Sequence, residues 1–154
     1  MYNVSAVKWL QKAGYRQKLT QIILGYSQSY ISKLYAKDMS KYVPSIDHIT
    51  EEQRIRKYVV DKILECKPIT RNEAMFNEAD IAYIKLMDFC LVDREKIKAV
   101  YYNISPYKIA RAFRDNKVTF MQFQPQLIGI TEEEYSIFLE QVFLFLLFFQ
   151  SLFW

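Results

Sequence analysis

The sequence predicts an all-α fold built from two repeated units of three helices each, joined by a helical connector. Three observations predict it. Apolar residues recur at spacings of three and four, the period of a helix with one buried face. Glycine occupies only 3 of 154 positions, well below average usage, which favours helices over turn-rich β structure. One segment of the chain also occurs in two diverged copies.

The repeat aligns residues 16–35 with residues 94–113 without a gap. A second block follows in both halves, at residues 44–52 and 125–133, with about three residues inserted between the blocks of the second half. Two matched blocks in the same order favour a tandem repeat. Five pairs carry the first match: Arg16/Arg94, Leu19/Ile97, Ser27/Ser105, Ile31/Ile109 and Lys33/Arg111.

The repeat also sets the expected domain boundaries. We expect a first unit with a trailing helix at residues 1–66, a connector at 67–81, and a second unit with an apolar C-terminal helix at 82–154. Units of this size bury little core. They are therefore expected to pack on each other or on a partner chain.

Three helices are expected in the first unit. Apolar residues recur at helical spacing over residues 4–10, and Gly14 ends that helix. A second helix should run over residues 16–23, followed by a tight turn in which Gly25 supplies the positive φ. Ser27 is a suitable N-cap for the third helix, because its hydroxyl can accept from a backbone N–H of the first turn.

Residues 25–34, Gly-Tyr-Ser-Gln-Ser-Tyr-Ile-Ser-Lys-Leu, resemble the turn and recognition helix of Cro/repressor-type helix-turn-helix proteins. In that family a glycine occupies the turn, Gln-Ser opens the recognition helix, and an aliphatic residue six positions after the glycine locks the helix to the core. Gly25, Gln28 and Ile31 match these features. The family usually has alanine four residues before the glycine, where this chain has Gln21. The resemblance implies that this unit binds double-stranded DNA.

The outward face of the third helix is the expected DNA contact. A recognition helix presents its first residues to base edges in the major groove. Glutamine can pair with adenine through two hydrogen bonds, serine suits phosphate or base contacts, and lysine suits phosphates. The same glutamine could also simply be a solvated residue at the helix start, and we expect Tyr30 to pack in the core or at its rim. The predicted contacts are Gln28, Ser29, Ser32, Lys33 and Lys37.

The second unit has its own turn at residues 102–104, where Asn103 is expected to adopt positive φ. Ala99 lies where the small helix-crossing residue is expected, and Ser105-Pro106 is a strong helix start. Residues 105–123 are locally similar to the second helix-turn-helix of AraC-type activators, without that family's glycine. The similarity implies further DNA contacts on the outward face of this helix: Tyr107, Lys108, Arg111 and Arg114.

The other expected helices lie between and after these units. The sequence Thr-Glu-Glu-Gln at 50–53 predicts a capping box that opens a helix to about Cys66, and Thr131 opens its counterpart. Residues 70–87 are expected to form a further helix. Residues 137–154 are nearly all apolar, but their uninterrupted apolar run is shorter than the about 20 residues that span a bilayer.

We therefore expect the C-terminal helix to be buried between the units or in a homodimer core. The alternatives are association with a membrane and a terminus altered from the natural sequence. Membrane insertion is not expected, because no Lys or Arg flanks the apolar run.

The distribution of charge indicates a polyanionic partner. Residues 1–43 carry net +6 and residues 82–124 carry net +4, whereas residues 44–81 and 125–154 carry −2 and −4. Positive charge is thus concentrated in the two repeated segments, as expected if both face DNA. An ordinary solvated helix surface would give a similar pattern.

The sequence gives no indication of an enzyme. It has no phosphate-binding glycine loop, nucleophile motif or CxxC, and the single histidine cannot build a histidine-based metal site. We expect no cofactor and no metal. The two cysteines, Cys66 and Cys90, are too few for a disulfide framework, and no apolar leader segment opens the chain. A cytoplasmic protein is therefore expected.

The predicted function is sequence-specific DNA binding by a transcriptional regulator of phage or mobile-element type. The alternative is an interaction protein that uses the same folds to bind and inhibit a host protein complex, such as a defence system or a polymerase.

Overall fold

The computed structural model describes residues 2–38 and 40–152, with side chains through Phe148 in the last helix. Every regular element in this part of the chain is helical, which confirms the all-α prediction. The contacts divide the chain into two compact units. Unit 1 comprises residues 1–60 and 133–154, and unit 2 comprises residues 61–132. The boundaries therefore differ from the expected ones, because the C-terminal segment groups with the N-terminal residues.

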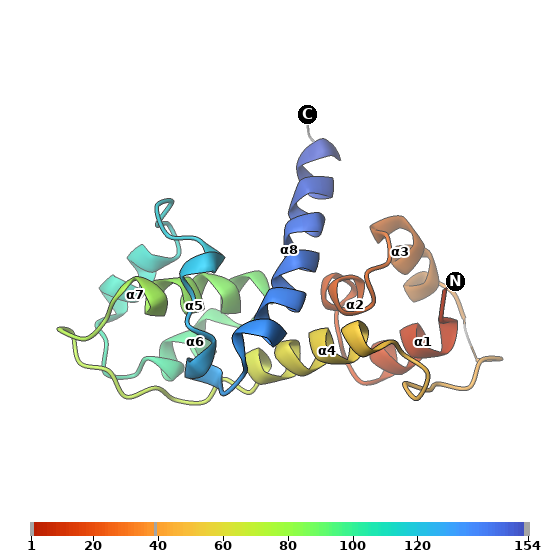
Figure 1. Cartoon of the computed structure of the whole chain (residues 1–154), viewed down its shortest axis with the longest axis horizontal. Helices are drawn as coiled ribbons and strands as arrows, with labels where there is room; N and C mark the ends of the chain where they lie inside the picture. The colour runs from red at the N-terminus through yellow and green to blue at the C-terminus, as the bar shows by residue number, and fades with distance from the viewer. Residues whose placement is uncertain (1, 39, 153–154) are drawn as a thin grey trace. The chain divides into compact units, whose positions relative to one another are not determined.

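Unit 1 contains the three helices expected near the N-terminus (Figure 1). They are α1 (Val4–Lys12), α2 (Gln17–Leu24) and α3 (Gln28–Ala36). Most of α4 (Glu51–Leu64) and of α8 (Glu132–Leu152) belongs to the same unit. The core between them is aliphatic, and residues such as Val7, Leu10, Ile22, Ile23, Ile31 and Val59 are buried.

The turn between α2 and α3 is closed by side chains of α4. Gly25 ends α2 with φ 76° and ψ 24°, the left-handed conformation predicted for it. The last carbonyls of α2 have no partner within the helix. Gln53 Nε2 donates to the carbonyl of Leu24 at 2.9 Å, and Arg56 Nε donates to the carbonyl of Ile23 at 2.8 Å. These two hydrogen bonds hold the end of α2 against α4, and with it the turn that leads into α3.

The predicted capping box opens α4. The backbone N–H of Thr50 donates to Gln53 Oε1 at 2.9 Å, and the N–H of Gln53 donates to Thr50 Oγ1 at 3.2 Å. The glutamine that caps α4 is thus the one whose amide reaches α2. One side chain therefore fixes two helix ends at once.

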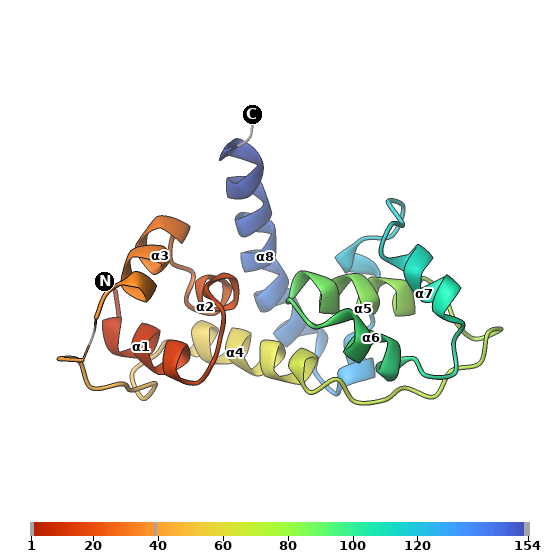
Figure 2. The same cartoon turned by 180° about the vertical axis from the view of Figure 1, so that it is seen from behind.

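Unit 2 contains α5 (Glu78–Phe89), α6 (Arg94–Val100) and α7 (Pro106–Ala112), seen from behind in Figure 2. Two short 3-10 helices follow, η1 (Phe120–Gln122) and η2 (Pro125–Ile128). Residues 94–113, which align with α2 and α3 in the sequence repeat, thus also form two helices separated by a turn. As in unit 1, a serine caps the second helix of the pair: Ser105 Oγ accepts from the N–H of Tyr107 at 3.2 Å.

The expected helix from Thr70 begins only at Glu78, so most of the predicted connector at 67–81 is not helical. Pro68 cannot donate a backbone hydrogen bond, and the N–H of Ile69 donates instead to the carbonyl of Val100 at 2.8 Å. A side-chain cap then sets the start of α5, because Asn77 Oδ1 accepts from the N–H of Asp80 at 3.3 Å. Local capping outweighs the helical periodicity that the sequence shows upstream.

Asp80 is the fully buried carboxylate of unit 2. Its Oδ1 accepts from Arg71 Nε at 3.1 Å and from Tyr101 Oη at 2.8 Å, and its Oδ2 accepts from the N–H of Asn77 at 3.0 Å. Burial, followed by the neighbouring Asp80 carboxylate, raises the pKa of Tyr101 well above its ordinary value. The phenol therefore stays protonated and donates to Asp80, which ties α6 to α5.

Two expectations for the second turn were wrong. Asn103 does not adopt positive φ; among the described non-glycine residues only Cys66 and Leu91 do so. The turn closes instead between two buried residues, because the N–H of Ile104 donates to the carbonyl of Tyr101 at 3.0 Å. Ala99, expected where two helices cross, is exposed. Ile97 and Val100 are the residues of α6 that face the core.

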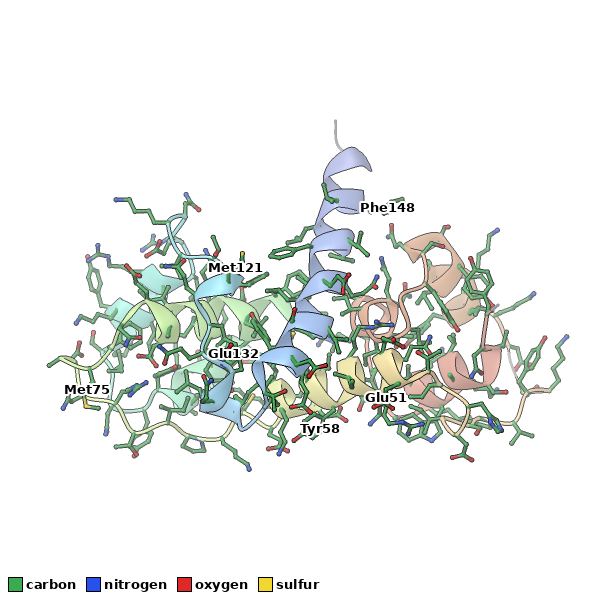
Figure 3. The ribbon with its side chains drawn as sticks, viewed as in Figure 1. Glu51, Tyr58, Met75, Met121, Glu132 and Phe148 are labelled. Carbon is green, nitrogen blue, oxygen red and sulfur yellow. The ribbon has the colours of Figure 1, made fainter. Side chains whose placement is uncertain are left out.

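The predicted apolar C-terminal segment forms the long helix α8, and its last side chains, 149–154, lie outside those described. Phe138 and Val142 are fully buried in the first half of the helix. Further along, apolar side chains including Leu147 are exposed. Phe148, labelled in Figure 3, is one of them. Among the described helices, none combines the length and the apolar character needed to cross a bilayer.

Candidate nucleic-acid interface

The helix α3 is anchored to the rest of unit 1 by Tyr35. Its hydroxyl donates to the carbonyl of Tyr15 at 2.7 Å and lies 2.6 Å from Thr20 Oγ1. A phenol has one proton, so Thr20 is the donor of the second bond. Gln11 Nε2 donates to the carbonyl of Tyr35 at 3.1 Å. Together with the buried Ile31 and Leu34, these bonds fix which face of α3 points outward.

The outward face of α3 is polar and continuous. Gln28, Ser29, Ser32 and Lys33 are all exposed, and at 100° per residue they lie within an arc of about 140°. Lys37, the C-cap residue, is also exposed just beyond the helix. No acidic residue occurs between positions 28 and 37. The structure thus brings together all five residues that the sequence predicted as DNA contacts in this unit.

A cluster of tyrosines borders this face. The rings of Tyr2 and Tyr30 stack with centroids 4.1 Å apart, and Tyr26 meets Tyr30 edge-on at 5.8 Å. Tyr26 Oη accepts from the N–H of Asn3 at 2.8 Å, which ties the start of α1 to the turn before α3. Burial, followed by the neighbouring tyrosines, raises the pKa of Tyr30. Tyr30 packs at the rim of the helix, as the sequence indicated.

The predicted contacts of unit 2 are exposed but differ in their surroundings, and Arg114 lies just beyond the end of α7. Lys108 Nζ forms an ion pair with Glu73 Oε2 at 2.7 Å, and the N–H of Ser105 donates to the other oxygen of that carboxylate at 2.9 Å. The hydrogen bond from Lys108 is the main cause that lowers the pKa of Glu73. A carboxylate therefore lies at the start of α7, where the sequence predicted DNA contacts. Tyr107 is 69% exposed, with the Arg111 guanidinium 5.8 Å from its ring centre.

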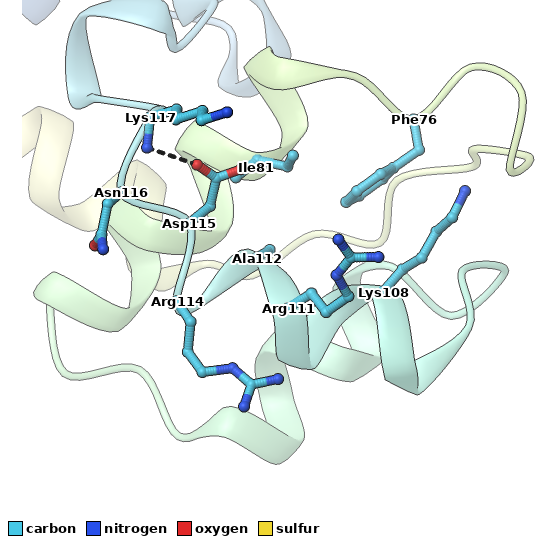
Figure 4. A pocket seen from close by; sticks show the side chains of 9 residues that line it. All are labelled: Phe76, Ile81, Lys108, Arg111, Ala112, Arg114, Asp115, Asn116 and Lys117. Carbon is cyan, nitrogen blue, oxygen red and sulfur yellow. Dashed lines mark hydrogen bonds between the residues drawn. The ribbon is translucent and has the colours of Figure 1, made fainter.

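Beside α7 lies a pocket of about 600 Å³ in unit 2 (Figure 4). Three of the predicted contacts line it: Lys108, Arg111 and Arg114. The loop residue Phe76 and Lys117 also line the pocket, although neither is among the contacts predicted from the sequence. Lys117 could have been predicted, because it continues the series of basic residues that begins at Lys108. The sequence around Phe76 contains no signal for a binding site.

The described residues 2–38 and 40–152 contain no group of three His, Cys, Asp or Glu side chains placed to hold a metal ion. Comparison with protein-family models, with curated proteins and with solved structures gives no significant match.

Proposed function

We propose that this protein is a non-catalytic, sequence-specific DNA-binding regulator of phage or mobile-element type that uses two helix-turn-helix units. In unit 1, α3 enters the major groove and its first residues meet base edges. In unit 2, α7 supplies cations to the phosphate backbone. The observation that carries the proposal is the polar face of α3, presented by a helix pair whose turn has the glycine and the serine cap of the Cro/repressor resemblance.

The physical chemistry of α3 supports a base-reading role. A helix fits the major groove, where each base pair presents a distinct set of donors and acceptors. Gln28 is the first residue of α3 and is exposed, so its amide lies where recognition helices contact bases. Lys33 and Lys37 lie further along, where contacts to phosphates set the register. The anchoring of α3 through Tyr35 limits the entropy lost on binding.

Loss of cations beside α7 should weaken binding to every DNA sequence alike. We expect Arg111→Ala and Arg114→Ala each to reduce the slope of log affinity against log salt by about 0.9, the contribution of one phosphate contact. The measurement is a titration of fluorescent duplexes, selected from a random pool and scrambled, at several salt concentrations. If Arg111 reads guanine instead, Arg111→Ala also reduces the preference for the selected duplex.

The matched control is Arg54→Ala, which removes an exposed arginine on α4 in unit 1. It should keep the salt slope of the parent. Parental slopes in both α7 variants would exclude α7 from the DNA interface, and failure of the parent to bind any duplex would reject the proposed function itself.

A second candidate function is an interaction protein that binds and inhibits a host protein complex. The tyrosine cluster beside α3 favours it, because Tyr2 is 56% exposed and tyrosine is enriched in protein interfaces. Pull-down with the parent and with Tyr2→Ala separates the two functions. A protein partner that is lost with Tyr2→Ala and kept with Gln28→Ala would favour this candidate.

The proposed regulator is expected to form a homodimer through α8. Leu144, Leu147 and Phe148 are 54%, 64% and 49% exposed and lie on one side of the helix, at spacings of three and four. Burying one leucine stabilises association by about 1.5–3 kcal/mol and occurs twice in a symmetric dimer. Leu147→Glu should therefore raise the dimer dissociation constant about a hundredfold or more in analytical ultracentrifugation.

The matched control is Ser136→Glu, which adds the same charge on the same exposed side of α8, about three turns earlier. It should keep the parental assembly. Equal masses for Leu147→Glu and the parent across the concentration range would contradict the dimer, and so would recovery of the parent only in membrane fractions.

A further inference from the structure

We propose that the pocket of unit 2 binds a nucleoside monophosphate group, with the phosphate held by Arg111 and Lys117 and the base lying against Phe76. The group could belong to a free nucleotide or to an unpaired nucleotide in a DNA strand, since both present the same chemistry. This inference concerns unit 2 alone and goes beyond the proposed contact between α7 and duplex DNA.

The charge of the pocket suits a phosphate. Four of its nine lining residues are cationic and one is acidic. The acidic residue, Asp115, turns its Oδ1 toward backbone, where it accepts from the N–H groups of Lys117 at 2.8 Å and Val118 at 3.1 Å. Glu73 already pairs with Lys108. Within the described part of the chain no ion pair engages Arg111 or Lys117, so their charges can face a bound anion.

The opposite wall of the pocket is apolar and contains an aromatic ring. Phe76 lines the pocket with Ile81 and Ala112. The ring of Phe76 meets Tyr101 edge-on, with centroids 5.7 Å apart at an angle of 90°. Tyr101 is itself held by its hydrogen bond to the buried Asp80. The position of the Phe76 ring is thus fixed by the core of unit 2, although the residue lies in a loop.

The directions of the side chains distinguish the cations. In Figure 4 the guanidinium of Arg111 points toward the ring of Phe76, and Lys117 extends toward Ile81. Arg114, which also lines the pocket, points away from Phe76. Arg111 is therefore the cation beside the Phe76 ring, and Lys117 is the cation on the Ile81 side of the pocket. Lys108 also extends to the side of Phe76, but it is paired with Glu73. A guanidinium can bind phosphate through two parallel hydrogen bonds, and an aromatic ring can stack on a base.

These features together define the class of ligand. A volume of about 600 Å³ lies within the range of sites for small organic molecules. Inorganic phosphate would leave the wall at Phe76 without a partner, and an apolar molecule would leave Arg111 and Lys117 uncompensated. A molecule with a planar apolar group and a phosphate uses both sides of the pocket.

Isothermal titration of the full chain at low salt with AMP, adenosine and inorganic phosphate tests the proposal. AMP should bind at least about tenfold more tightly than either of the others. Arg111→Gln should weaken AMP binding about tenfold or more, because the positive charge and the paired donors of the guanidinium are lost. Phe76→Leu should weaken AMP binding about tenfold but leave phosphate binding unchanged, because it removes only the stacking surface.

The control is Arg54→Gln on unit 1, which should bind AMP like the parent. Circular dichroism shows whether each variant keeps its helices. If Phe76→Leu loses its helices, AMP binding by Arg111→Gln alone tests the proposal. Equal binding of AMP and adenosine would overturn the proposal, and so would parental AMP binding in Arg111→Gln. Amide NMR shifts on addition of AMP should centre on residues 76, 111 and 117; shifts confined to unit 1 would also overturn it.

A single-stranded tetra-deoxyadenylate distinguishes the two sources of the group. Binding tighter than AMP assigns the pocket to a nucleotide of a DNA strand, and weaker binding assigns it to a free nucleotide. Both results agree with a pocket that binds a nucleoside monophosphate group. A chain that binds AMP but no duplex would support the pocket and reject the DNA-binding function, so the two proposals fail separately.

Discussion

Replacing Asp80 by alanine should destabilise unit 2 by about 3–5 kcal/mol, the cost of removing one partner from a buried ion pair. Three donors lose their acceptor at once: Arg71 Nε, Tyr101 Oη and the N–H of Asn77. The Arg71 side chain is 19% exposed and would keep a charge with little solvent to compensate it. Urea unfolding followed by circular dichroism measures the loss.

The matched control is Glu95→Ala, which breaks the pair between Glu95 and Lys98 at the surface of the same unit. The Glu95 side chain is 81% exposed, so its removal should change stability by no more than about 1 kcal/mol. Asp80→Asn should fall between the two, because the amide keeps the shape and one acceptor but not the charge. If Asp80→Ala unfolds at the same urea concentration as Glu95→Ala, the hydrogen bonds that Asp80 accepts do not stabilise unit 2.

Replacing Gln28 by alanine should reduce the preference for a selected duplex over a scrambled one by about 1–3 kcal/mol, provided that the amide makes a bidentate base contact. Binding to the scrambled duplex should hardly change, because glutamine carries no charge and contributes little to phosphate binding. The slope with salt should stay that of the parent. Titration of both duplexes with parent and variant gives the two free energies.

Gln17→Ala is the control for this prediction, since Gln17 is likewise an exposed glutamine at the first position of its helix, α2. It should leave both affinities unchanged. If Gln28→Ala and the two α7 variants all bind both duplexes like the parent, neither helix contacts DNA. The protein-interaction alternative then becomes the better explanation of the exposed face of α3.

Most of unit 1 could be predicted because its helices begin and end at local signals. Gly25 in the left-handed conformation, Ser27 as an N-cap and the reciprocal bonds of Thr50 and Gln53 involve residues within four positions of one another. The outward face of α3 then follows from helical geometry once Ile31 and Leu34 are assigned to the core. Local propensity and burial agree throughout this segment.

Unit 2 shows where this reasoning failed. The exposure of Ala99 and the negative φ of Asn103 depend on how α6 packs, and packing is set by buried Tyr101 and Ile104. The late start of α5 depends on a cap at Asn77 that competes with an otherwise helical pattern upstream. At Ala99 and Asn103, contacts with another part of the unit outweighed the local preference of the residue. At the start of α5, a local cap outweighed the helical pattern upstream.

The sequence by itself determined the all-α class, the helix ends with strong caps and the polar face of α3, because each depends on neighbours along the chain. Only the tertiary structure decided that Glu73 neutralises Lys108 across 35 positions of sequence, that Phe76 faces Arg111, and that α8 groups with unit 1. Each of these arrangements joins parts of the chain that are far apart in the sequence. They depend on the burial of apolar surface, which is not directional and does not specify which distant residues meet.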